Sequence, residues 1–88
     1  MSDTVALLQT ALQALQPEHL EIEDDSAAHA GHAGARSGGG HYNLLIVSSR
    51  FTGLGSLARH RLVYTTLGDL MKTKVHALAI RALTPDEL

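Results

Sequence analysis

Residues 41–83 read HYNLLIVSSRFTGLGSLARHRLVYTTLGDLMKTKVHALAIRAL and contain a predicted strand, helix and strand. The run LLIV at 44–47 is typical of a strand covered on both faces, and VHALAIRAL at 75–83 favours a second strand. Between them, residues 56–72 place apolar side chains at the spacing of a helix. A helix between two strands forces a crossover, so we expect these strands to be parallel with a right-handed connection.

The chain before this unit predicts one helix and one strand. Residues 3–16 carry apolar side chains three and four residues apart, and Pro17 ends this helix because it disfavours helical geometry at the residue before it. Residues 20–23 read LEIE, an alternation typical of a half-buried strand. This strand reaches the strand at 44–47 through a loop alone, so we expect the two to be antiparallel.

The predicted fold class is α+β with two layers, in the order helix, strand, strand, helix, strand, helix. Its sheet has three strands in a mixed arrangement, with the helices on one face. We expect one domain over residues 1–88, in which residues 26–40, rich in Gly, Ala and His, form a flexible loop. The last helix is predicted from Thr84-Pro85-Asp86-Glu87, which has the pattern of a capping box. We predict that the helix at 56–72 buries His60, Val63, Tyr64, Leu67, Leu70 and Met71.

Composition excludes several classes of protein. The 88 residues include no cysteine and six histidines. Without cysteine the chain cannot form disulfides, a thiolate zinc site, a thiol nucleophile or an iron–sulfur site made of its own thiolates. No apolar run approaches the ~18 residues of a membrane span, and a basic segment followed by an apolar one is missing at the start. We therefore expect a soluble cytoplasmic protein.

Neither the motifs nor the charge identify an enzyme. A nucleophile elbow, a phosphate loop and a carboxylate pair in apolar surroundings are all missing, so no catalytic activity is predicted. The net charge of −2 combines −6 over residues 1–35, which have six acids and no Lys or Arg, with +4 over residues 36–88, which have seven bases and three acids. The basic part is compatible with an anionic partner and equally with an ordinary solvated surface.

Two motifs resemble the BolA family. They are RFTGLGSLARHRLVY at 50–64 and VHALAIRALTPDE at 75–87, and a looser match extends over residues 7–49. The resemblance implies a fold similar to the type II KH topology, in agreement with the order of elements above. The chain departs from many relatives at 27–40, where it reads AHAGHAGARSGGG after Ala27, and this departure weakens residue matching in that loop.

The resemblance implies a metal-ligand role for histidines. In BolA-like proteins the histidine of the V-H-A-L phrase, here His76, is the expected ligand of a two-iron two-sulfur cluster shared with a monothiol glutaredoxin. The second ligand is expected in the loop between the first two strands, at His29, with His32 as its competitor. His41 begins the next strand and is expected to orient or pack more than to ligate. The residues alone, without the resemblance, indicate an ordinary strand-end histidine at His76. For His29 and His32 they indicate a loop that binds metal only adventitiously.

The absence of cysteine fits this implication, because a partner must then supply thiolates. The resemblance implies a cluster held by the glutaredoxin cysteine, a glutathione thiol and two histidines of this chain, with none bound by the isolated chain. The expected role is that of a non-enzymatic adaptor in cluster trafficking or iron sensing. A homodimer of the apo form stays open.

A second class of function rests on Arg50, Arg59, His60 and Arg61. BolA-like proteins have been regarded as DNA-binding transcriptional regulators, and KH-like folds bind single strands through a G-x-x-G loop. Here Gly53-Leu54-Gly55-Ser56 is G-x-G, and aromatic residues for stacking are few. The group is a candidate contact for a protein partner or for DNA, and equally a set of helix-surface charges paired with the acidic N-terminal part.

Overall fold

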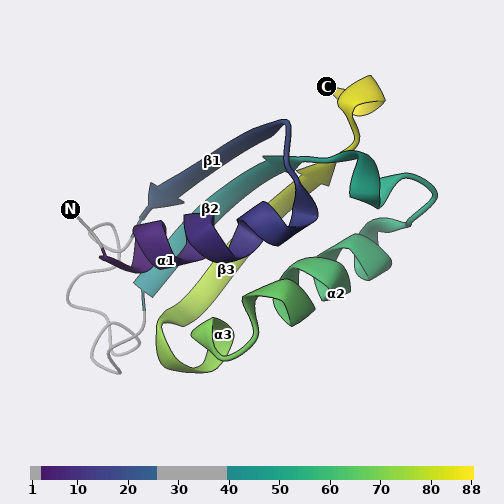
Figure 1. Ribbon diagram of the computed structural model, residues 1–88. Coiled ribbons are helices and arrows are strands. Elements are labelled where there is room, and N and C mark those ends of the chain that lie inside the picture. The colour runs from purple at the N-terminus through teal and green to yellow at the C-terminus, as the bar shows by residue number, and fades with distance from the viewer. Residues whose placement is uncertain (1–2, 26–39) are drawn as a thin grey trace.

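The computed structural model describes residues 3–25 and 40–88. Its helices and strands follow the predicted order (Figure 1). They are α1 (Asp3–Leu12), β1 (His19–Asp24), β2 (Gly40–Val47), α2 (Ser56–Leu67), α3 (Leu70–Thr73) and β3 (Val75–Leu83), with short 3-10 turns at Gln13–Leu15, Ser49–Phe51 and Pro85–Glu87. The predicted α+β class is confirmed. The predicted loop at 26–40 falls outside the described residues, except for Gly40, which begins β2.

The sheet has the predicted mixed topology. Its strand order is β1-β2-β3, with β1 antiparallel to β2 and β2 parallel to β3. The parallel pairing of β2 and β3 follows from their connection, because α2 and α3 carry the chain from the end of β2 back to the start of β3. In consequence the start of β2, the start of β3 and the end of β1 lie at the same end of the sheet (Figure 1).

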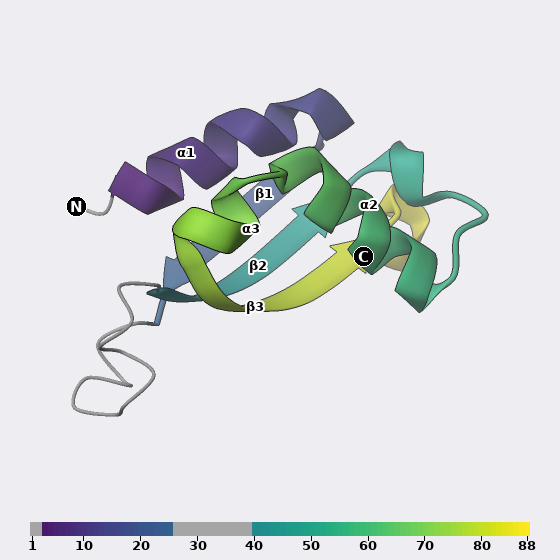
Figure 2. The ribbon, with the colours of Figure 1, turned by 90° about the horizontal axis from the view of Figure 1, so that it is seen from below.

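The helices cover one face of this sheet, as predicted, and leave the other face open (Figure 2). Between the layers lies a core of apolar side chains. Its most deeply buried members are Leu8, Leu12, Ile46, Phe51 and Val63. The alternation predicted for residues 20–23 is also present, since Leu20 and Ile22 pack against the core and the two glutamates are exposed.

The first predicted helix is shorter than expected. α1 ends at Leu12, and a 3-10 turn continues to Leu15. Gln16 then adopts a left-handed conformation, φ 50°, just before Pro17. Proline disfavours helical geometry at the preceding residue, so the helical segment ends before Gln16 and its last turn tightens into a 3-10 turn.

The second predicted helix, 56–72, is broken in two. Gly68 has φ 56° and ψ −127°, a backbone conformation that glycine adopts and L side chains rarely do, and it separates α2 from α3. The burial predicted for Tyr64 is wrong, because 42% of it is exposed. Successive helical residues lie about 100° apart, so Tyr64 turns away from the side on which Val63 and Leu67 are buried.

The C-terminal turn forms the predicted capping box. Glu87 accepts a hydrogen bond from the Thr84 backbone nitrogen at 2.8 Å, and the Thr84 side chain accepts one from the backbone of Glu87. Pro85 follows as the first residue of a 3-10 turn that ends at Glu87. Among the described helices, none is both long enough and apolar enough to cross a membrane.

Candidate functional site

Two histidines meet at the end of the sheet where β2 and β3 begin. His41 is the second residue of β2 and His76 is the second residue of β3. Their ring centroids lie 5.1 Å apart with the planes inclined by 50°. His41 is half-buried, whereas His76 is exposed. The two imidazoles therefore form a pair at this end of the sheet, and His76 is its exposed member.

An irregularity in strand pairing produces this approach. Gly40 pairs with Val75, and the next residue of β2, His41, pairs with Ala77. His76 is thus an extra residue in β3 without a partner of its own in β2. An extra residue of this kind bends its strand locally and re-aims a side chain. Here it places the ring of His76 beside the ring of His41.

The surroundings of the pair contain few further metal ligands. Asp25, just beyond β1, donates a backbone hydrogen bond to the carbonyl oxygen of His41 at 2.8 Å. A shallow hollow of about 200 Å³ is lined by Asp25, His41 and residues of β2 and β3. Within residues 3–25 and 40–88, no group of three or more His, Cys, Asp or Glu residues could hold a metal ion. The described residues thus offer two imidazoles, which is a donor set that needs ligands from elsewhere.

The four residues of the predicted basic contact group lie at the far end of the sheet and differ in their interactions. Arg50 is exposed and donates a hydrogen bond from Nη2 to Oε1 of Gln16 at 3.1 Å. His60 is half-buried and Arg61 is exposed, both on α2. The guanidinium of Arg61 has no hydrogen-bond or ion-pair partner in the described part of the chain.

Arg59 is held by the fold itself. Its guanidinium donates to the carbonyl oxygens of Leu54, at 2.8 Å, and Ala82, at 3.0 Å. It also donates to both carboxylate oxygens of Glu87, at 2.6 and 3.0 Å. Only 14% of its side chain is exposed. Hydrogen bonds from the Arg59 guanidinium and the Thr84 backbone lower the pKa of Glu87 to about 2, and the same contact with Glu87 raises the pKa of Arg59.

Most of this sequence matches one known protein family. The family model described as BolA-like protein matches residues 12–87. The chain belongs to the BolA family.

Curated members of the BolA family support this assignment. SufE-like protein 1 of Arabidopsis thaliana, named as chloroplastic/mitochondrial, is 48% identical over 79 residues, which are 84% of this chain and 21% of that protein. BolA-like protein 1 of Bos taurus is 47% identical over 81 residues, which are 91% of this chain and 58% of the relative. A relative in Escherichia coli, named as the DNA-binding transcriptional regulator BolA, is 45% identical over 74 residues, covering 84% of this chain and 68% of the relative. The chain therefore spans about a fifth of the length of the first relative and somewhat more than half of the length of the second.

Solved BolA structures have the same fold. The BolA domain of SufE1 from Arabidopsis thaliana superposes with a TM-score of 0.86 at 41% identity, covering 100% of this chain and 99% of that chain. The solution structure of BolA1 from Mus musculus gives a TM-score of 0.81 at 42% identity, covering 99% of this chain and 69% of that chain. The cytoplasmic location of this BolA-family chain stays a prediction.

The predicted ligand residues of this BolA-family chain have different outcomes. His76 lies where it was expected, exposed at the start of β3. His29 and His32 lie outside the described residues, so their roles stay predictions. His41, which was expected to orient or pack, is the described histidine whose ring lies beside that of His76.

Two features of the BolA-family structure were missed from the sequence. The proximity of His41 and His76 had a usable signal, because the starting ends of neighbouring parallel strands meet at one edge of a sheet. The contact between Arg59 and Glu87 had none, because the residues are 28 positions apart and their approach depends on how the last turn packs against α2.

Proposed function

We propose that this BolA-family domain contributes histidine ligands to a two-iron two-sulfur cluster that it shares with a monothiol glutaredoxin. The partner's cysteine and a glutathione thiol would supply the thiolates. The observation that carries the proposal is the ring contact between half-buried His41 and exposed His76 in a chain without cysteine.

The donor set fits a shared cluster. Histidine can replace cysteine on one iron of a two-iron two-sulfur cluster, so neutral imidazoles are suitable ligands. The described residues lack a third ligand near the pair, and the exposure of His76 leaves room for a second protein to approach. The domain would act as an adaptor that receives, holds or passes a cluster and catalyses no reaction of its own.

His76 is the first proposed ligand, and the second comes from His29, His32 or His41. The first two belong to residues 26–39, which precede β2 in the sequence. The ring contact with His76 supports a role for His41, either as the second ligand or as the residue that orients His76. One set of variants separates these roles, because a lost ligand abolishes cluster capture and a lost orienting residue weakens it.

The test is anaerobic coexpression with a monothiol glutaredoxin, followed by visible absorption and circular dichroism of the purified complex. We expect a cluster-bearing heterodimer that His76→Ala abolishes. Of the variants His29→Ala, His32→Ala and His41→Ala, the one that removes the second ligand has the same effect. His19→Ala, at the opposite end of β1, is the matched control and should leave the spectrum unchanged. A spectrum unaffected by His76→Ala contradicts the proposal.

A second candidate function is DNA binding, which is favoured by the name of the Escherichia coli relative. Arg50 and Arg61 are the exposed members of the basic group and would contact phosphates, whereas the guanidinium of Arg59 is committed to Glu87 and two carbonyl oxygens. Affinity for duplex DNA should then fall steeply as salt rises, and each of Arg50→Ala and Arg61→Ala should reduce that salt dependence by about one unit of slope. Affinity that neither substitution changes would eliminate this candidate.

A further inference from the structure

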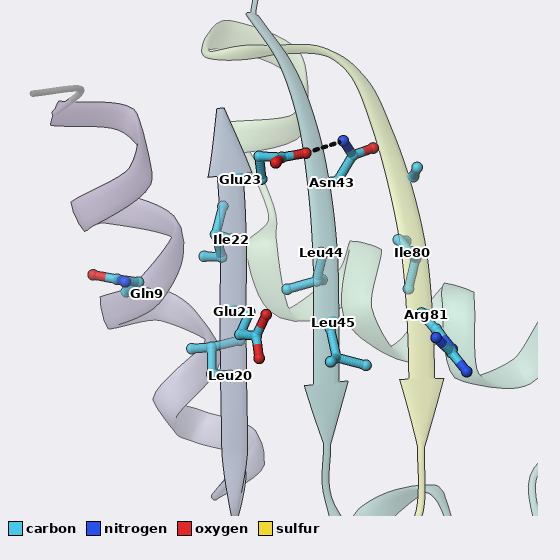
Figure 3. Close-up of a pocket in the computed structure, with 11 residues that line it drawn as sticks. Gln9, Leu20, Glu21, Ile22, Glu23, Asn43, Leu44, Leu45, Ile80 and Arg81 are labelled. Atoms are coloured by element: carbon cyan, nitrogen blue, oxygen red, sulfur yellow. Dashed lines mark hydrogen bonds between the residues drawn. The ribbon is translucent and has the colours of Figure 1, made fainter. Parts of the chain in front are cut away.

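The open face of the sheet carries a groove with opposite charges on its two sides. Side chains of all three strands line this groove, which has a volume of about 670 Å³ (Figure 3). On the β1 side it is bounded by Glu21 and Glu23, and on the β3 side by Arg81. All three are exposed, and Leu45 of β2, which is half-buried, lies between them.

Strand register places three of these residues in one row. Glu21 pairs with Leu45 across the antiparallel ladder, and Leu45 pairs with Arg81 across the parallel ladder. The row therefore reads acid, leucine, base from one edge of the sheet to the other (Figure 3). The Glu21 carboxylate is hydrogen-bonded to the ring of His19, its neighbour on the same face, whereas the guanidinium of Arg81 has no hydrogen-bond or ion-pair partner among residues 3–25 and 40–88.

This order of charges is complementary to itself. When two copies face each other about a two-fold axis parallel to the strands, β1 of one copy lies over β3 of the other and β2 lies over β2. The axis keeps each row opposite the same row, so Glu21 meets Arg81 of the second copy and the two Leu45 side chains meet in the centre. A two-fold interface makes the charge contact twice. Sheets packed face to face run within about 30° of each other at a spacing of about 10 Å, which leucine side chains from both sides can fill.

We propose that the open face is a self-association surface, in which Glu21 of one copy pairs with Arg81 of a second copy around a Leu45–Leu45 contact. Any partner of this face must present a base opposite Glu21, an apolar side chain opposite Leu45 and an acid opposite Arg81. A second copy of the chain presents this order of side chains. The proposal involves neither the cluster nor the glutaredoxin, so it stands or falls independently of the proposed function.

The size of the face sets the expected strength. Three strands spaced about 4.8 Å apart, with about six residues each at about 3.4 Å, cover on the order of 300 Å² per copy. Stable dimers bury about 800 Å² per partner, so this contact belongs to the weak and transient class. We expect a dissociation constant of roughly 0.1–1 mM, with the monomer predominant in dilute solution.

The test is sedimentation equilibrium of the full chain alone, from about 20 µM to about 1 mM, a range that brackets the expected dissociation constant. The average mass should rise with concentration. Glu21→Lys and Arg81→Glu each place like charges opposite each other, and each should weaken association by about tenfold or more. An equimolar mixture of these two variants should associate again, because the introduced lysine meets the introduced glutamate while the native arginine of one chain meets the native glutamate of the other.

The matched controls reverse charges away from the open face. Arg61→Glu lies on α2, and Asp69→Lys lies between α2 and α3, so both should associate as the native chain does. Far-UV circular dichroism establishes that each variant is folded. A native chain that remains monomeric at about 1 mM overturns the proposal, as does a mixture that associates no better than its separate components.

Discussion

The guanidinium of Arg59 on α2 donates two hydrogen bonds to the carboxylate of Glu87, at 2.6 and 3.0 Å. The same guanidinium also binds the carbonyl oxygen of Ala82 near the end of β3. Paired, planar contacts of this kind are a geometry that arginine provides and lysine does not. Arg59 therefore ties the last turn of the chain to the helix layer and occupies a carbonyl group of β3.

The first prediction concerns acid stability. The pKa of Glu87 is about 2 in the folded chain, below its ordinary value of 4.5, chiefly because of the hydrogen bonds from Arg59. A depressed carboxyl pKa stabilises the fold above the ordinary value, and this contribution is lost as pH falls from about 4.5 toward about 2. Glu87→Gln should lower the unfolding midpoint at neutral pH, and its difference from the native chain should shrink over that acidic range. Urea unfolding at several pH values measures this difference.

The matched control for this prediction is Asp86→Asn. It removes the neighbouring exposed carboxylate, which has no hydrogen-bond or ion-pair partner in the described part of the chain. Its difference from the native chain should not follow the pattern of Glu87→Gln. A midpoint difference for Glu87→Gln that stays constant from neutral pH to about pH 2 would show that the Arg59 contact does not depress the Glu87 pKa.

The element order and topology were predictable from local patterns. Alternation at residues 20–23, the apolar run at 44–47 and the helix between two strands are sufficient to predict a mixed three-stranded sheet, because a crossover makes two strands parallel. The break at Gly68 was not predictable in this way. Leu70 and Met71 continue the apolar spacing of α2, so the sequence pattern does not distinguish one helix from two, and the positive φ of Gly68 decides between them.

Only the family resemblance singled out His76 as a candidate ligand. Composition and spacing describe His76 equally well as an ordinary strand-end residue. Its contact with His41 arises from the extra residue in β3, and strand register is a property of the assembled sheet. The row of Glu21, Leu45 and Arg81 depends on the same register and was invisible for the same reason.

Gly68→Ala is predicted to be destabilising. At φ 56° and ψ −127° an L side chain is strained, at a cost of about 1–3 kcal/mol in the free energy of unfolding. The carbonyl oxygen of Thr65 would lie 3.9 Å from the new Cβ, an ordinary contact, so the cost comes from the backbone. Gly55→Ala is the control, because Gly55 has φ −77° and open space around its Cβ position. Equal stability of the two variants would contradict the prediction.

Ser48→Ala is predicted to loosen the junction between the first helix segment and the end of β2. The Ser48 hydroxyl is fully buried, donates to the carbonyl oxygen of Leu15 at 2.6 Å and accepts from the Arg50 backbone nitrogen at 3.1 Å. Removing it leaves buried polar groups without partners, which costs about 1–3 kcal/mol. Urea unfolding should show a lower midpoint with an unchanged slope. Ser49→Ala, at an exposed neighbour, should stay close to the native stability, and an equal loss in both variants would refute the prediction.

Gly40→Ala is predicted to disturb the ring of Tyr42, next to the histidine pair. A Cβ at Gly40 would lie 2.6 Å from Cε2 and Cζ of Tyr42, and closer still to its hydroxyl oxygen, so the ring must shift. Tyr42 is 5% exposed, and a displaced buried ring costs about 1–3 kcal/mol. Gly40 also donates its backbone N–H to the carbonyl oxygen of Lys74 at 3.2 Å, just before β3, so a shift here reaches the strand ends that carry His41 and His76. We expect changed Tyr42 and His41 NMR signals together with lower stability. Gly55→Ala should change neither, and native Tyr42 signals in Gly40→Ala would contradict the prediction.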